Sequence, residues 1–251
     1  MSTAKVDHIG LSRKRQNGLT FVEDYSQSPV GDILVHLAES NDRRDVNQHG
    51  EAYEIETANL LGKLTQKRFR KIIYASSSVL YGDQSITPRK ENDPLFVYDS
   101  YTRVKHLSEH LVTANKGTIL RFSNLYGKGM SDKNVMSTIL KQIKTPDPIA
   151  LRSTNPIRDF LWVEDAARAI IQSIQYDLKG IYNVGSGVGT SIGQLADLFV
   201  QIIGQNNRQI NSQDEKKIPS HLVLDISKIV QTTDWYPQMS LKQGIARLLY
   251  N

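Results

Sequence analysis

The stretch that decides the fold of this chain reads Lys71-Ile-Ile-Tyr-Ala-Ser-Ser-Ser-Val-Leu-Tyr-Gly82. Its apolar, β-branched run predicts a buried strand over Ile72–Ala75, and the serines that follow predict a turn at the carboxyl end of that strand. Further along, Tyr101-Thr-Arg-Val-Lys105 lies inside a helical pattern that covers Ser100–Asn115. Residues four apart share one face of a helix, so we expect the tyrosine and the lysine to lie one turn apart.

A tyrosine and a lysine at this spacing suit acid–base chemistry on an alcohol. A lysine ammonium near a phenol stabilises the phenolate and lowers the pKa of the phenol towards the working pH. A serine hydroxyl at the end of a parallel strand, here Ser77, can share the same proton. A tyrosine and a lysine four apart are by themselves usually a solvated helix face. The ordered combination of strand, serine turn and Tyr-x-x-x-Lys is the stronger signal.

Elsewhere, short apolar runs alternate with helical patterns, which is typical of a parallel sheet covered by helices. Strands are expected at Val6–Leu11, Leu19–Val22, Ile33–Leu37, Ile72–Ala75, Thr118–Phe122 and Ile181–Val184. Helices are expected at Val46–Lys67, Ser100–Asn115, Asn134–Lys144, Val163–Gln175, Ile192–Ile203, Asp225–Val230 and Leu241–Tyr250. Two proline-containing loops, Tyr81 to Tyr98 and Thr145 to Pro156, are expected to shape a ligand site or to serve as plain connections.

The motifs together resemble the extended short-chain dehydrogenase/reductase superfamily, in particular its NAD-dependent sugar epimerase/dehydratase family. The resemblance covers roughly residues 30–250 and includes Arg121-Phe-Ser-Asn124-Leu-Tyr-Gly127, Ile157-Arg158-Asp159-Phe160 and Tyr182-Asn-Val-Gly185. It implies an α/β fold with a Rossmann-like parallel sheet, helices on both faces and a small C-terminal substrate-binding domain. The implied Rossmann-like domain is 1–126 with 157–183, and the implied substrate-binding domain is 127–156 with 184–251.

The same resemblance implies roles for individual residues. The implied catalytic residues are Ser77, Tyr101 and Lys105. The implied contacts to the cofactor NAD are Leu37, Ala38, Asn59, Ser76, Tyr101 and Lys105, and those to a nucleotide-diphosphate sugar are Ser78, Asn124 and Arg158. Asn59 reads equally well as a helix-surface amide, and His36 reads as a buried histidine rather than a catalyst. The family's 4,6-dehydratases hold an Asp-Glu pair where this chain has Ser78 and Val79, so we do not expect dehydratase chemistry.

Composition bounds the function further. The chain has 251 residues, 39% of them hydrophobic, a formal net charge of +5 and no cysteine. We therefore expect a globular protein without disulfides or thiolate-bound metal. There is neither an apolar leader nor a run of about 18 apolar residues, which predicts a cytoplasmic protein without a membrane span. The basic balance suits a dinucleotide or a nucleotide sugar. The basic cluster at 67–71 is expected to be a solvated helix end rather than a nucleic-acid surface.

The glycine-rich turn that normally binds NAD is missing from this sequence. The glycines up to residue 50 are Gly10, Gly18, Gly31 and Gly50, and they do not form the Gly-x-x-Gly-x-x-Gly pattern. Val6–Leu11 resembles the family's second strand, so the chain is expected to start about one βα unit late. We expect Val6–Leu11 to pair with a doubly buried Asp32–Ala38 in place of the missing strand. A homodimer covering that edge and a longer parent protein are the alternatives.

Two functions stay open at this point. The first is a nucleotide-sugar 4-epimerase or 4-ketoreductase in which NAD(H) carries the hydride and the Ser-Tyr-Lys set handles the proton. The second is a non-catalytic nucleotide-sugar-binding or partner subunit that has lost the cofactor-binding turn. The catalytic set favours the first function. The missing turn favours the second and predicts weak or absent NAD binding.

Overall fold

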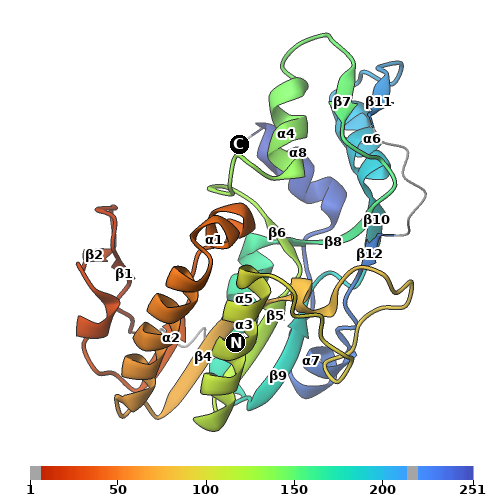
Figure 1. Ribbon diagram of the computed structural model, residues 1–251. Coiled ribbons are helices and arrows are strands. Elements are labelled where there is room, and N and C mark those ends of the chain that lie inside the picture. Colours follow the sequence, from red (N-terminus) through yellow and green to blue (C-terminus); the bar gives the residue numbers. More distant parts are fainter. Residues whose placement is uncertain (1–6, 214–219, 251) are drawn as a thin grey trace. The chain divides into compact units, whose positions relative to one another are not determined.

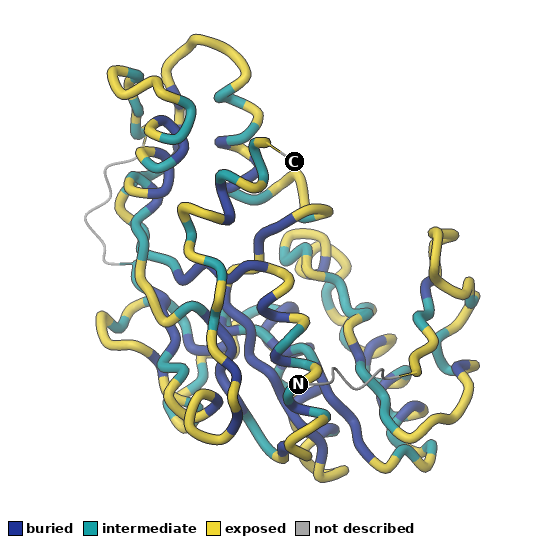
Figure 2. Tube along the Cα trace, turned by 180° about the vertical axis from the view of Figure 1, so that it is seen from behind, coloured by how far each residue is buried: buried dark blue, intermediate teal, exposed yellow. Residues whose placement is uncertain are grey.

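The computed structural model describes residues 7–213 and 220–250, which form an α/β protein with parallel strands and flanking helices (Figure 1). The chain divides into two compact units. The first unit contains the residues up to Tyr74 together with Tyr98–Gly117. The second unit contains Ala75–Val97 and the residues from Thr118 onward. In each unit, buried stretches alternate with exposed turns along the trace (Figure 2).

The first unit is built on a parallel pair of strands. β3 (Ile33–His36) pairs with β4 (Lys71–Ser77) in a register that runs from Ile33 opposite Lys71 to His36 opposite Tyr74. The apolar residues of β4 in this unit are all buried, as a continuous run of β-branched and aromatic side chains predicts. The expected strands at Ile33–Leu37 and Ile72–Ala75 are therefore confirmed.

Three helices complete the first unit: α1 (Arg43–His49), α2 (Glu51–Gln66) and α3 (Ser100–Ala114). The single helix expected over Val46–Lys67 is interrupted at Gly50, whose φ of 56° and ψ of −134° no helix accommodates. α2 and α3 lie side by side (Figure 1). α3 starts where the sequence predicts because Asp99 and Thr102 form a reciprocal capping box at its first turn.

The expected pairing of Val6–Leu11 with Asp32–Ala38 is wrong. Val6 lies outside the described residues, and β1 (Leu11–Ser12) instead pairs in parallel with β2 (Thr20–Phe21), ahead of the short 3₁₀ helix η1 (Tyr25–Gln27). Within the part of the chain that the structure describes, β3 pairs with β4 alone. β3 is half-buried over its first three residues rather than buried on both faces. The backbone groups around β1 are satisfied by β2 instead, with the Thr20 N–H donating to the Gly10 carbonyl at 2.7 Å and the Val22 N–H donating to the Ser12 carbonyl at 3.0 Å.

The second unit combines a parallel pair with shorter strands. β5 (Thr118–Phe122) and β9 (Gly180–Val184) pair in parallel along their full lengths. Around β8 (Ile157–Trp162) lie three partners, β6 (Asn124–Tyr126), β10 (Gly189–Ser191) and β12 (His221–Leu222). β7 (Ile149–Leu151) pairs with β11 (Ile210–Ser212), so the expected loop from Thr145 to Pro156 contains a short strand.

The helices of the second unit follow the sequence closely. They are η2 (Ser78–Tyr81), α4 (Val135–Gln142), α5 (Val163–Gln175), α6 (Ile192–Ile202), α7 (Ser227–Thr232) and α8 (Leu241–Tyr250). The five α-helices match the expected ranges because each presents one apolar stripe to the core. That core includes Tyr126, Phe160, Trp162, Phe199 and Ile245. Among the described residues, we find no helix with the length and apolar character that crossing a bilayer requires.

Candidate functional site

Helix α3 presents the expected tyrosine and lysine together. Tyr101 and Lys105 are both buried, at 8% and 6% exposure. The Lys105 ammonium nitrogen lies 5.9 Å from the centroid of the Tyr101 ring. The two side chains therefore share one helix face, as their spacing predicts. The ammonium group therefore lies beside the phenol ring.

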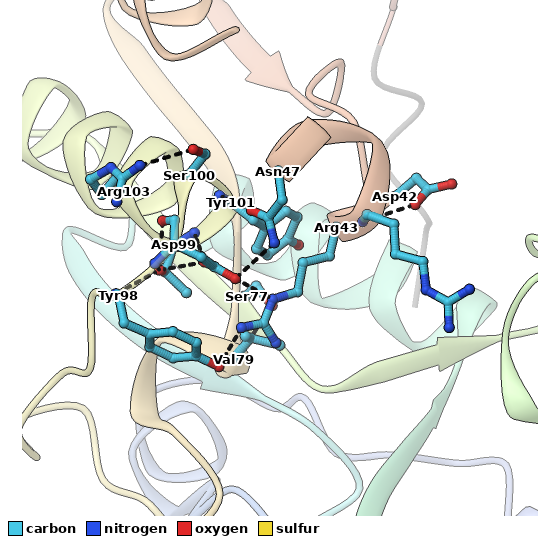
Figure 3. A network of polar contacts seen from close by, with 12 residues as sticks. Asp42, Arg43, Asn47, Ser77, Val79, Tyr98, Asp99, Ser100, Tyr101 and Arg103 are labelled. Carbon is cyan, nitrogen blue, oxygen red and sulfur yellow. Dashed lines mark hydrogen bonds and ion pairs between the residues drawn. The ribbon is translucent and has the colours of Figure 1, made fainter. Parts of the chain in front are cut away.

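A polar network fixes the first turn of α3 (Figure 3). The Asn47 side-chain carbonyl accepts a hydrogen bond of 2.9 Å from the backbone N–H of Tyr101, and the Asn47 amide donates to Asp99 at 3.0 Å. Arg43 Nε donates to the same Asp99 carboxylate at 2.7 Å. Burial works to raise the pKa of Asp99, but hydrogen bonds from Thr102, Asn47 and Arg43 outweigh it and lower the pKa to about 2. The backbone that carries Tyr101 is thus held by an ionised cap.

A buried carboxylate binds Lys105. Glu39 Oε2 lies 2.9 Å from Lys105 Nζ, and the two side chains are 4% and 8% exposed. The Tyr74 hydroxyl donates to Glu39 Oε2 at 2.5 Å, and the Ser108 hydroxyl donates to Oε1 at 2.8 Å. His36 Nε2 lies 3.7 Å from Oε1. Glu39 thus accepts hydrogen bonds from β4 and α3, with His36 of β3 beside it.

The electrostatics of this cluster follow from burial and charge pairing. Burial works to lower the pKa of Lys105, but Glu39 and Tyr101 outweigh it, so the pKa is raised and the ammonium is charged at neutral pH. Burial works to raise the pKa of Glu39, but Lys105, His36 and the Tyr74 hydroxyl outweigh it and lower the pKa. Burial lowers the pKa of His36 and, together with Glu39, raises that of Tyr74 well above its ordinary value. Glu39 and Lys105 form an ion pair, while Tyr74 keeps its proton.

Glu39, Tyr74 and Ser108 were not predicted from the sequence as parts of this cluster. One signal was available for Glu39, because an acidic residue directly after the apolar run Ile33–Ala38 lies where a parallel strand ends. The interpretation of His36 as a buried histidine is confirmed, since it is 4% exposed.

The remaining residues expected to contact NAD lie in varied settings. Leu37 is 58% exposed, Ala38 is half-buried and Ser76 is buried. Asn59 is exposed on the face of α2 opposite to the buried Thr57 and Leu61. With Arg13, Asp24 and Lys63 among its neighbours, Asn59 lines a cavity of about 290 Å³. Cofactor contact by these four residues stays a prediction.

In the second unit, Ser77 ends β4 and caps η2, where its hydroxyl accepts a hydrogen bond of 3.3 Å from the N–H of Val79. Ser78, which follows it, is buried. Asn124 is exposed on β6 and donates to the backbone carbonyl of Asp159 at 3.1 Å. The predicted roles of these three residues are not decided by their contacts.

Arg158 on β8 is already engaged within the protein. Its guanidinium donates to the Asp83 carboxylate at 3.1 Å and to the Ser220 hydroxyl at 2.7 Å. It also donates to the backbone carbonyls of Ile157 and Ser220. The side chain is 24% exposed, so one part of the guanidinium faces solvent. Arg158 is thus held in place with its charge partly neutralised.

Three of the family-like motifs meet in a buried network of the second unit. Arg121 donates to the Tyr81 hydroxyl at 2.8 Å, and Tyr81 donates to the side-chain carbonyl of Asn183 at 2.8 Å. The Asn183 amide donates to the backbone carbonyl of Arg89 at 2.7 Å. All four residues are at most 8% exposed, and the guanidinium of Arg121 also lies 4.9 Å from the Tyr81 ring centroid. These motif residues hold the fold rather than face a ligand.

Comparison with known proteins identifies the class. The model of the NAD dependent epimerase/dehydratase family matches residues 18–185. A candidate UDP-glucose 4-epimerase of Methanocaldococcus jannaschii is 29% identical over 233 residues, covering 87% of this chain and 76% of that protein. The dTDP-4-dehydro-6-deoxyglucose reductase of Escherichia coli is 28% identical over 191 residues, covering 71% of this chain and 60% of the reductase.

The fold agrees with this result. The crystal structure of UDP-glucose 4-epimerase from Thermotoga maritima with UDP-glucose superposes with a TM-score of 0.78 at 21% identity, covering 92% of this chain and 84% of that one. The chain therefore belongs to the NAD dependent epimerase/dehydratase family. Both the expected family and the expected Rossmann-like α/β fold are confirmed.

Proposed function

We propose that this chain is a nucleotide-sugar 4-epimerase or 4-ketoreductase with Tyr101 as its acid–base residue. The observation that carries the proposal is the buried pair of Tyr101 and Lys105, with a charged ammonium 5.9 Å from the phenol ring. The names of two relatives, a 4-epimerase and a 4-keto-sugar reductase, fit the same chemistry at the sugar 4-position. The proposed division into a Rossmann-like and a substrate-binding domain stays a prediction.

In this proposal the protein moves one proton. The Tyr101 phenolate accepts the proton of the sugar 4-hydroxyl when the alcohol is oxidised, and the phenol returns it when the ketone is reduced. Lys105 stabilises the phenolate by its positive charge. Ser77 would orient the hydroxyl, a role that rests on its place in the sequence pattern. Bound NAD(H) would supply the complementary hydride transfer.

The residues of this chain suit the nicotinamide ribose of NAD better than its pyrophosphate. Tyr101 and Lys105 are donors suited to a nicotinamide ribose, and Leu37, Ala38, Asn59 and Ser76 are the other proposed contacts. Helix α1, by contrast, is capped by Asp42, whose carboxylate accepts hydrogen bonds from the N–H groups of Arg44 and Asp45 at 3.1 and 3.2 Å. A pyrophosphate at this helix end would meet a carboxylate rather than open N–H groups. We therefore propose NAD(H) as a weakly held cofactor.

For the substrate we propose a nucleotide-diphosphate sugar. Ser78, Asn124 and Arg158 are the proposed contacts, and all three belong to the second unit. The outer part of the Arg158 guanidinium suits a phosphate oxygen because it is cationic, planar and positioned by its internal bonds.

Substitution of the acid–base residue tests the enzymatic proposal. Tyr101→Phe should reduce turnover of a UDP-sugar by roughly 10²–10⁴-fold, because the ring stays and only the proton-carrying hydroxyl is lost. Initial rates with added NAD(H) measure the effect, and circular dichroism checks the fold. Tyr98→Phe is the matched control, since Tyr98 lies just before α3 and is 62% exposed. Near-normal turnover of Tyr101→Phe would reject the assignment.

A non-catalytic nucleotide-sugar-binding subunit is the second candidate. The acidic cap of α1 and the absent glycine-rich turn favour it, because both weaken cofactor binding. The two candidates differ in turnover. The binding subunit would take up a UDP-sugar and show no reaction at any NAD(H) concentration.

A further inference from the structure

The side chain that binds Lys105 has no part in the chemistry proposed above. Glu39 follows β3, is 4% exposed, and pairs with Lys105 at 2.9 Å. We propose that Glu39 is a positioning residue: it is the counter-ion that keeps the Lys105 ammonium charged and fixed beside Tyr101. Its effect on Lys105 is independent of any activity, and its effect on turnover rests on the proposed function.

Aromatic rings border the Lys105 ammonium. Lys105 Nζ lies 5.1 Å from the ring centroid of Tyr74 and 5.9 Å from that of Tyr101, so aromatic faces border it on two sides. A ring face attracts a cation but cannot replace the water that the ammonium loses on burial. Glu39 supplies the full opposite charge at hydrogen-bond distance. The carboxylate is therefore the strongest neighbour that the structure shows for this ammonium.

Several ionisable groups act on Lys105 or on its partner Glu39. They are His36 on β3, Glu39 after it, Tyr53 on α2, Tyr74 on β4 and Tyr101 on α3. Ser108 and Glu109 on α3 act on Tyr74. Burial lowers the pKa of His36 and raises that of Tyr74, so both are neutral at pH 7. Burial alone favours the neutral amine of a lysine and can shift its titration down by several units. Glu39 opposes that tendency most strongly, and Tyr101 and Tyr53 add to its effect.

The Glu39 carboxylate is itself held in place by hydrogen bonds. Glu39 accepts hydrogen bonds from the hydroxyls of Tyr74 and Ser108, in addition to its bond with Lys105. These donors come from β4 and α3, so the carboxylate bridges the strand pair and the helix. A shorter side chain at position 39 would reach Lys105 less well, and an uncharged one would not balance the charge of the ammonium. The consequence for Tyr101 follows: a neutral Lys105 would leave the phenolate of the proposed reaction without the positive charge beside it.

The direct test follows Lys105 by NMR of the intact chain labelled with ¹³C at lysine Cε, with Lys105→Met used to assign the signal. In the wild type, the Lys105 signal should stay that of an ammonium up to pH 9. In Glu39→Gln, it should titrate at or below pH 9, a loss of proton affinity of at least about tenfold. Glu54→Gln is the matched control, because Glu54 on α2 forms an ion pair of 2.8 Å with Arg103, which lies on α3 as Lys105 does. An unchanged Lys105 titration in Glu39→Gln would overturn the proposal.

A second variant covers the case in which Glu39→Gln does not fold. The double variant Glu39→Gln/Lys105→Met removes both charges, and it should fold if the uncompensated ammonium caused the failure. Failure of the double variant as well would overturn the counter-ion role, because the defect would then lie in packing around position 39.

Turnover separates this inference from the proposed function. In an active enzyme, Glu39→Gln should lose activity as pH rises through the new Lys105 titration, and Glu39→Asp should restore part of it. A wild-type chain without turnover would reject the enzyme, yet the NMR shift of Lys105 would still support Glu39 as the counter-ion. A normal pH–rate profile in Glu39→Gln would reject the counter-ion role even in an active enzyme.

Discussion

At the scale of single residues, Asp99 links the stability of the first unit to pH. Its folded-state pKa of about 2 lies below the ordinary value of 3.8. The ionised carboxylate therefore adds stability above pH 3.8 that is lost as pH falls towards 2. Asp99 is 17% exposed, so solvent screens part of this effect, and we expect about 1–2 kcal/mol in total.

The measurement is urea unfolding at pH 5 and pH 3. Asp99→Asn keeps a residue that can cap a helix, but it cannot be protonated in this range. The free energy of unfolding should fall more steeply between the two pH values in the wild type than in Asp99→Asn. Equal losses in both proteins would show that other carboxylates carry the acid sensitivity.

The site was predictable from sequence where its geometry is local. Tyr101 and Lys105 are neighbours because a helix brings residues four apart together, and this holds before any tertiary contact forms. Glu39 and Tyr74 reach Lys105 only through the pairing of β3 with β4 and the packing of α3. No spacing within one element encodes such a contact. The engaged state of Arg158 depends on Asp83 and Ser220 in the same way.

At the scale of elements, two helix glycines distinguish the effect of helix propensity from the effect of side-chain packing. Gly62 lies inside α2, and a Cβ built there meets nothing within 4 Å. Gly244 lies in α8, where a Cβ would overlap the hydroxyl and ring of Tyr126. Gly62→Ala should raise the free energy of unfolding by about 0.5–1 kcal/mol, since alanine favours the helix.

Gly244→Ala should lower that free energy by about 1–3 kcal/mol instead, because Tyr126 is buried and must shift. Each variant is the control for the other, and chemical denaturation of both proteins measures the difference. Stabilisation by Gly244→Ala would mean that α8 can move away from Tyr126 without loss.

The predicted helices and strands show the same difference between features set by the local sequence and features set by distant contacts. α3, α5 and α8 match their expected ranges to within a residue because caps and apolar stripes are properties of the segment itself. Strands of two or three residues, such as β10 and β12, are too short to show an alternation. The break between α1 and α2 depends on the positive φ of Gly50, and an isolated glycine within a helical pattern is usually tolerated.

At the scale of the whole molecule, the chain should bind its two proposed ligands with unequal strength. We expect a UDP-sugar to bind measurably, and NAD to bind with a Kd above about 1 mM, because the sequence shows no glycine-rich turn to hold the pyrophosphate. Isothermal titration calorimetry with each ligand in turn measures both affinities. Micromolar binding of NAD would refute the expectation.

The same titration tests Arg158. Arg158→Ala should weaken UDP-sugar binding by about 1–3 kcal/mol, the scale of a lost charged hydrogen bond, and should leave NAD binding unchanged. Asp83→Asn is its control, since it removes the negative partner at 3.1 Å and keeps the guanidinium. Equal affinities for the UDP-sugar in Arg158→Ala and the wild type would remove this residue from the proposed site.

The hydrogen bond from Arg121 to Tyr81 affects how genetic variants of this chain should be interpreted. Arg121 belongs to a motif that resembles a ligand-binding strand end, yet it is 2% exposed and bonded inside the second unit. In a screen scored by growth or colour, its variants would be grouped with those of Tyr101. The yield of soluble protein would distinguish the two groups. A variant at Arg121 lowers the amount of folded protein, whereas Tyr101→Phe removes only the catalytic activity.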